Sequence, residues 1–136
     1  MTYIPENLRR RVAERAAYRC EYCLVHQDDV LYTHEIDHII PTKHRGETVP
    51  ENLCLSCLDC NRSKGSDFAS FDPETAQIVR LFNPRQQRWL DHFRLDGAFI
   101  TSLSLVGQVT IFLLKFNSPR RLRSRQALRY AGRYPP

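Results

Sequence analysis

The chain has 136 residues, of which 42% are hydrophobic, and its formal net charge is +5. This length suits one compact domain with an appendage, and the hydrophobic content argues against wholesale disorder. The N-terminus lacks the basic start and apolar run of a secretory signal, and the most apolar stretch, residues 98–116, carries Lys115 and several polar residues that suit a bilayer poorly. We therefore expect a cytoplasmic (intracellular) protein without a membrane span.

The first predicted element is a helix that begins at Pro5 and ends near Tyr18, with apolar side chains four residues apart on one face. Residues 34–40, rich in Ile, predict a short strand, and residues 51–55 predict a brief return strand. A second helix is expected over residues 58–64, where a glycine follows. These elements together predict a small core of strand, loop, strand and helix.

The second half of the chain has different signals. Residues 67–74 are polar and predict a turn-like connection, whereas Asp96-Gly97 predicts the turn of a hairpin. Residues 106–116 and 120–130 predict two helices. The predicted fold class is α+β. We expect a core domain over residues 1–66, which includes the N-terminal helix, and a C-terminal extension over residues 67–136 that packs on this core and ends in a basic tail.

Positive charge is concentrated at the C-terminus. Residues 97–136 contain seven Lys or Arg and no Asp or Glu, whereas residues 1–96 contain 13 basic and 15 acidic side chains. Guanidinium groups suit phosphate geometry and give salt-sensitive, sequence-independent affinity. The segment predicts a face that binds a polyanion, with a solvated basic tail as the alternative. The arginines expected on one helix are Arg120, Arg121, Arg123 and Arg125.

The cysteines form a pattern typical of metal binding. Four of the five form two Cys-x-x-Cys pairs, Cys20/Cys23 and Cys57/Cys60, and Cys54 is expected to be a small buried residue. Disulfides are not expected in a reducing compartment. Each pair can supply two thiolates to a tetrahedral Zn²⁺. A site filled by four thiolates has no open position, so this zinc would stabilise the fold and perform no chemistry.

Polar residues between and beside the cysteine pairs suggest a second, reactive centre. A hard cation such as Mg²⁺ prefers oxygen ligands, which the carboxylate of Asp37 and the amide of Asn61 can supply, with Glu35 as a spare ligand. His38 can take up a proton near neutral pH. Because neighbouring residues of a strand point to opposite faces, we expect one residue of the Asp37-His38 pair to bind a metal while the other activates a water.

These residues resemble the signature of the HNH endonuclease family in its zinc-stapled version. The resemblance covers residues 20–65 and rests on Asp37-His38-Ile-Ile-Pro41, Asn52-Leu53 and Cys57-x-x-Cys60-Asn61-x-x-Lys64. It implies a ββα-metal fold, in which a β-hairpin and a helix surround one divalent ion.

The resemblance also implies a role for each polar residue. His38 would be the general base, Asp37 and Asn61 would ligate the catalytic Mg²⁺ or Mn²⁺, and Asn52 would fix the backbone of His38. Two positions depart from the family pattern: Asn61 stands where many members have a final histidine, and Arg45-Gly46 replaces the usual Gly-Gly.

The sequence therefore predicts a metal-dependent endonuclease that hydrolyses phosphodiester bonds of DNA, with RNA as a second substrate to test. Arg45, Arg62 and Lys64 are close enough in sequence to contact flanking phosphates, with plain solvation of the helix and loop as the alternative. The alternative function is a non-catalytic zinc-ribbon module that binds nucleic acid or protein. Cleavage specificity, biological role and oligomeric state stay open.

Overall fold

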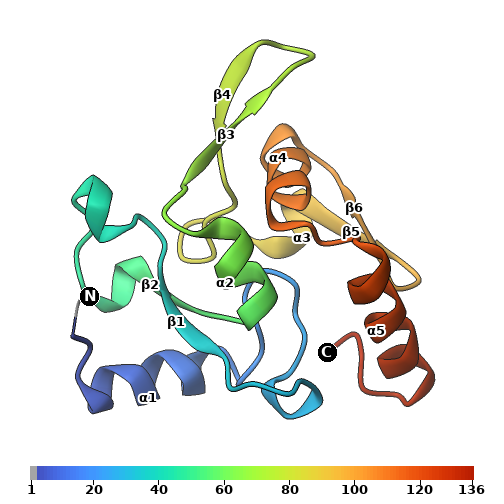
Figure 1. Cartoon of the computed structure of the whole chain (residues 1–136), viewed down its shortest axis with the longest axis horizontal. Coiled ribbons are helices and arrows are strands. Elements are labelled where there is room, and N and C mark those ends of the chain that lie inside the picture. The colour runs from blue at the N-terminus through green and yellow to red at the C-terminus, as the bar shows by residue number, and fades with distance from the viewer. Residues whose placement is uncertain (1–2) are drawn as a thin grey trace. The chain divides into compact units, whose positions relative to one another are not determined.

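The computed structural model describes residues 3–136, which form an α+β protein of five α-helices and three two-stranded antiparallel sheets (Figure 1). The chain divides into two compact units, one ending at Phe68 and the other spanning residues 69–136. Each unit is described by itself. No helix within residues 3–136 is long and apolar enough to cross a membrane.

The first unit contains two helices, one hairpin and three 3₁₀ turns. Helix α1 is shorter than predicted, because Ala17 and Tyr18 adopt left-handed backbone conformations with φ of 52° and 59°. The predicted hairpin and the second helix are present, and that helix ends at Lys64. The bounds are α1 Glu6–Arg15, β1 Glu35–His38, β2 Leu53–Ser56 and α2 Leu58–Lys64, with 3₁₀ turns at Gln27–Asp29, Thr42–His44 and Pro50–Asn52.

The β1–β2 hairpin separates an apolar face from a polar face. Its register pairs Asp37 with Cys54 and His38 with Leu53. Leu53 and Leu55 join Ile4 and Val12 in the buried core on the α1 side, because alternate residues of a strand point to the same face. The other face of β1 is turned toward α2, from which Lys64 and Asn61 reach it.

The second unit contains two hairpins and three helices around a cluster of aromatic rings. Phe93 and Phe116 are fully buried, and Phe82 packs edge-on against Phe93 with ring centroids 5.2 Å apart. The hairpin turn predicted at Asp96-Gly97 and the two predicted helices are confirmed. The bounds are β3 Ala69–Asp72, β4 Gln77–Arg80, α3 Trp89–His92, β5 Phe93–Asp96, β6 Phe99–Ser102, α4 Leu105–Leu114 and α5 Pro119–Tyr130.

The connection predicted over residues 67–74 is wrong in part, because residues 69–72 form strand β3 and pair with β4. The turn indicated by Asp72-Pro73 exists, but it begins where the strand ends. There the carboxylate of Asp72 accepts hydrogen bonds from the main-chain N–H and the hydroxyl of Thr75. Strand β3 is only four residues long, and it exposes Phe71 and buries Asp72, so its apolar residues do not mark a core-facing side that would predict it.

The loop from Pro41 to Gly46 imposes a packing constraint that can be tested. A Cβ added at Gly46 would lie 1.6 Å from the carbonyl oxygen of Ile40, so only glycine fits beside this backbone. Gly46→Ala is expected to lower the free energy of unfolding by about 2 kcal/mol or more, as overpacking against rigid neighbours does. Urea unfolding followed by far-UV circular dichroism measures this change.

Gly132, just after α5, supplies the control for this substitution. Its φ is +73°, but a Cβ there would meet no atom within 4 Å. Gly132→Ala should therefore cost only the backbone strain of about 1 kcal/mol. Equal costs for the two alanine variants would contradict the close approach at Gly46.

Candidate functional site

Four cysteines converge in the first unit. The sulfur atoms of Cys20, Cys23, Cys57 and Cys60 all lie within 4.8 Å of one another, and all four residues are buried. The Sγ atoms of Cys23 and Cys57 are 3.7 Å apart. Tetrahedral zinc with Zn–S bonds of about 2.3 Å places its sulfurs about 3.8 Å apart. The geometry and the chemistry of the donors therefore fit a zinc ion.

The local backbone prepares these thiols to act as ligands. The main-chain N–H of Cys23 donates to the sulfur of Cys20, and that of Cys60 donates to the sulfur of Cys57, which caps α2. Burial raises the pKa of the Cys60 thiol well above its ordinary value. A buried cluster of this kind needs a cation to hold its thiolates, since burial disfavours isolated negative charge.

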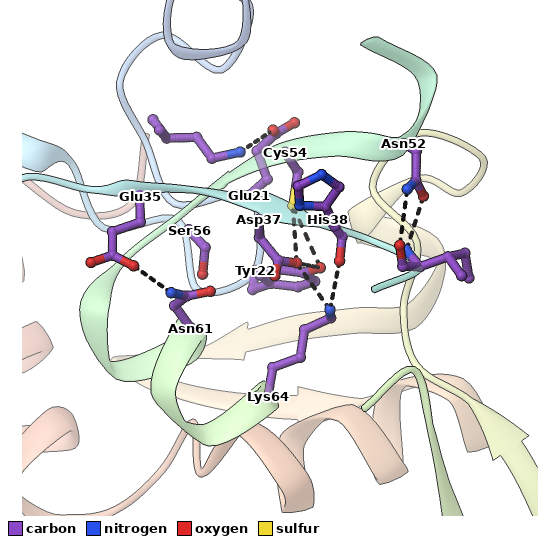
Figure 2. A network of polar contacts seen from close by, with 12 residues as sticks. Glu21, Tyr22, Glu35, Asp37, His38, Asn52, Cys54, Ser56, Asn61 and Lys64 are labelled. Carbon is purple, nitrogen blue, oxygen red and sulfur yellow. Dashed lines mark hydrogen bonds and ion pairs between the residues drawn. The ribbon is translucent and has the colours of Figure 1, made fainter. Parts of the chain in front are cut away.

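Asp37 lies at the centre of a buried polar network on the α2 side of β1 (Figure 2). Its side chain is 7% exposed, and its Oδ2 atom lies 3.0 Å from the Lys64 ammonium and accepts a hydrogen bond of 3.0 Å from the Tyr22 hydroxyl. The Cys54 thiol lies 3.8 Å from the same oxygen. Burial raises the pKa of Asp37, and the Lys64 charge opposes this effect.

All of these contacts use one oxygen of Asp37. Among the residues that the structure describes, its Oδ1 has no hydrogen-bond partner. Asn61 is arranged in a similar way, since its Nδ2 donates to the Glu35 carboxylate while its amide oxygen is turned away from Glu35 in Figure 2. Asp37 and Asn61 thus each retain one oxygen that can ligate a hard cation, and waters would supply the remaining ligands of Mg²⁺.

His38 points to the other side of β1. In Figure 2 its ring lies on one side of the strand, and the carboxylates of Glu35 and Asp37 lie on the other. The ring Nε2 is 2.9 Å from the hydroxyl oxygen of Thr48. Burial lowers the pKa of His38, more than the nearby Asp37 charge raises it. A lowered pKa favours the neutral ring, whose Nδ1 is left to take up a proton in the tautomer that donates from Nε2 to Thr48.

Asn52 fixes the chain just beyond the strand. Its Oδ1 accepts a hydrogen bond from the main-chain N–H of Ile40, and its Nδ2 donates to the carbonyl oxygens of Ile40 and Glu47. These three contacts join the segment after β1 to the end of the loop before β2. The Asn52 side chain therefore holds the main chain two residues beyond His38, whereas the resemblance implied a contact that fixes the backbone of His38 itself.

The basic residues singled out from the sequence are placed differently from one another. Arg45 and Arg62 are exposed, so their guanidinium groups can reach phosphate. Lys64 is only 1% exposed and is paired with Asp37, so the expectation that it contacts nucleic acid is wrong in this structure. A sequence pattern shows that a lysine ends the helix, but it does not show which way its ammonium points.

The four arginines predicted on one helix all lie in α5, but two of them face solvent and two are buried. Arg120 and Arg123 are exposed, whereas Arg121 and Arg125 are 5% and 1% exposed. Arg121 donates to the carbonyl oxygens of Leu114 and Lys115. Arg125 donates to the carbonyl oxygen of Ala98 and to Asn117. The prediction that these two buried side chains bind nucleic acid is therefore corrected, because their donors serve the fold.

Two residues of the site were missed from the sequence. Tyr22 is fully buried, and its hydroxyl binds Asp37. Thr48 was not singled out at all, although it is the hydrogen-bond partner of His38. Nothing in the sequence separates Thr48 from an ordinary loop threonine. For Tyr22, its place inside the first cysteine turn was a usable signal.

Comparison with known proteins bears directly on this site. Residues 20–67 match the HNH endonuclease family. The matched HNH segment covers about a third of the chain and includes both cysteine pairs, the hairpin and α2. No curated protein and no solved structure shows a significant match to the chain. The HNH match suggests nuclease activity, and the cysteine cluster of the HNH segment suggests zinc binding.

The cysteine cluster makes a prediction about metal content. Elemental analysis should find one zinc per chain, and Cys60→Ser should lose this zinc and unfold the first unit, because the metal closes that unit. Cys54→Ser is the matched control, since Cys54 is equally buried but lies outside the cluster. A Cys60→Ser protein that keeps both its zinc and its fold would refute the assignment.

Proposed function

We propose that the protein is a metal-dependent endonuclease that hydrolyses phosphodiester bonds of DNA. The observation that carries the proposal is the pair of oxygens at Asp37 Oδ1 and Asn61 Oδ1. Both belong to side chains whose other polar atom is held by a neighbour, and both lie in the HNH segment. Ligating side chains are commonly oriented by partners in this way.

The residues fit one divalent ion, Mg²⁺ or Mn²⁺. Asp37 and Asn61 would hold it, with Glu35 next to Asn61 as a further carboxylate on the same face of β1. A bound divalent ion neutralises the charge that develops on a phosphodiester and assists the departing oxygen. The remaining task, activation of the attacking water, belongs to the chain itself.

His38 is the residue suited to that task. Thr48 holds the ring at Nε2, and in the tautomer whose Nε2 donates to the Thr48 hydroxyl, Nδ1 is the nitrogen that would accept a proton from water. β1 ends at His38, so Asp37 and His38 lie at the same end of the strand although on opposite sides of it. A phosphodiester bound across this end would meet the metal ligands on one side and the base on the other.

The first test is a cleavage panel with plasmid DNA and with RNA, each in Mg²⁺, Mn²⁺ or Ni²⁺. The wild-type protein should nick or linearise the plasmid, and His38→Ala should lower the rate by about a hundredfold or more, as loss of a general base does. Asp37→Asn should lower it as well by weakening the metal site. Zinc content and circular dichroism of each variant serve as the folding controls.

The panel also tests the alternative function. A zinc-ribbon module that only binds its partner is favoured by one observation, namely that the side chains of Asp37 and His38 lie on opposite sides of β1. Such a module would bind nucleic acid or protein without cleaving it and would not depend on these two residues. Absence of cleavage with every metal and both nucleic acids would reject the nuclease proposal in favour of this module.

The exposed arginines of the second unit support binding to a polyanion. Arg120 and Arg123 lie on the exposed side of α5, and residues 97–136 contain no acidic side chain that would repel phosphate. Contacts of this kind give affinity that falls with salt and is independent of sequence. We propose that these two arginines, with Arg45 and Arg62 of the first unit, contact the phosphates of the substrate.

The contribution of α5 can be measured by fluorescence anisotropy of a labelled DNA duplex over a range of salt concentrations. Replacing both Arg120 and Arg123 by Gln should weaken binding and reduce the slope of log affinity against log salt by about two, since two phosphate contacts are lost. Replacing the exposed Arg80 and Arg94 by Gln removes the same charge elsewhere in the unit and should leave the slope nearly unchanged. Equal slopes for the two double variants would show that α5 makes no such contacts.

A further inference from the structure

We propose that Lys64, together with Tyr22, is a positioning residue of the nuclease site, which holds Asp37 as a ligand through one oxygen and fixes the main chain at His38. The inference rests on the proposed function and adds to it a positioning role for a residue that the sequence had assigned only to phosphate contact. The lysine was expected to bind substrate phosphate, and the structure places it inside the site instead.

The contacts of the Lys64 ammonium carry the inference. Its Nζ lies 3.0 Å from Asp37 Oδ2 and donates a hydrogen bond of 3.0 Å to the carbonyl oxygen of His38. One side chain from α2 therefore contacts both members of the Asp37-His38 pair. Figure 2 shows the ammonium between these two acceptors, on the side of β1 away from the His38 ring.

These contacts select which oxygen of Asp37 is left for a cation. Lys64 and the Tyr22 hydroxyl both bind Oδ2, so the carboxylate cannot turn without breaking an ion pair and a hydrogen bond in a buried site. Groups of this kind around a ligating carboxylate typically change metal affinity by about 10–100-fold when they are removed. Oδ1 is then presented in one fixed direction.

The contact with the main chain is the second half of the role. The side chain of His38 leaves β1 on the face opposite to Lys64, so the lysine can influence the ring only through the backbone. Thr48 holds the ring at Nε2, and Lys64 holds the carbonyl of the same residue. The Lys64 ammonium therefore contacts both His38 and Asp37, although the side chains of these two residues lie on opposite sides of β1.

The two groups that hold Asp37 Oδ2, Tyr22 and Lys64, come from the segments of the two cysteine pairs. Tyr22 lies between Cys20 and Cys23, and Lys64 follows Cys60 by one turn of α2. A zinc ion held by the cysteines would join these segments and so link the cluster to the Tyr22 and Lys64 groups that bind Oδ2, with no ligand shared between the two centres.

If Lys64 instead competed with the divalent ion for Asp37, its removal would have the opposite effect on metal binding. An ammonium that only occupied the place of a divalent ion would weaken metal binding, and its removal would tighten it. Removal of any positive charge from this unit should also tighten cation binding slightly by long-range attraction. A positioning role predicts weaker binding after the same substitution, so the sign of the change separates the two roles.

The test measures Mn²⁺ binding to the zinc-loaded full chain by electron paramagnetic resonance of free Mn²⁺, and the kinetics of plasmid cleavage. Lys64→Met keeps the length of the side chain and removes its charge, and we expect it to weaken Mn²⁺ binding about tenfold or more. It should also lower kcat with little change in KM for DNA. Lys43→Met removes an exposed charge of the same unit and should leave Mn²⁺ affinity unchanged or slightly tighter.

Tyr22→Phe guards against a folding failure of the lysine variant. It removes only the hydroxyl that binds Oδ2 and should weaken Mn²⁺ binding in the same direction by a smaller factor. The positioning role would be overturned if Lys64→Met bound Mn²⁺ as tightly as the wild type or more tightly. If Lys64→Met does not fold, unchanged Mn²⁺ affinity in Tyr22→Phe would overturn the role instead. Wild-type protein that neither binds Mn²⁺ through Asp37 nor cleaves would overturn the proposed function and this inference together. Cleavage that needs Asp37 but not Lys64 would overturn the inference alone.

Discussion

The convergence of four cysteines provides a metal site that can hold together a unit whose apolar core is small. Four buried residues, Ile4, Val12, Leu53 and Leu55, form the cluster between α1 and the hairpin. A core of this size contributes little margin against chain entropy, and small units commonly add a metal for this reason. The cysteines also bring the turn before the hairpin close to the start of α2. Tyr22 belongs to that turn and Lys64 ends α2, so the cysteine cluster and the polar site around Asp37 are built from the same short segments.

The second constraint is the alternation of side chains along β1, which places the metal-ligand candidates and His38 on opposite sides of the strand. Ile36 and His38 lie on one side of the strand, and Glu35 and Asp37 lie on the other. The apolar side is needed to cover the core, so the polar network can form only against α2. A buried carboxylate in such a place needs a cation and donors, which Lys64 and Tyr22 supply. His38, at the last position of the strand, is the one polar residue of the core-facing side.

The sequence predicted the parts of this site whose signals are local. Pro41 after the strand, the cysteine spacing and the glycine after Lys64 placed α2 correctly and each end of the hairpin strands within two residues. It could not predict contacts that depend on how elements meet. Lys64 reads as an exposed helix end, and only the packing of α2 on β1 turns its ammonium inward. β3 was missed because it is only four residues long and its alternation is inverted, with Phe71 exposed and Asp72 buried.

The arginines of α5 show how far a charge pattern can be read. Arg121 donates to the last carbonyls of α4, where the helix dipole is negative, and Arg125 joins Ala98 to Asn117, which itself binds both main-chain groups of Ile100. These two side chains cannot grip a phosphate without giving up contacts that hold β6, α4 and α5 together. Their charge still contributes to the field around the unit. Attraction of a polyanion at long range and contact with its phosphates therefore rest on different subsets of the same basic segment, and composition alone reports only their sum.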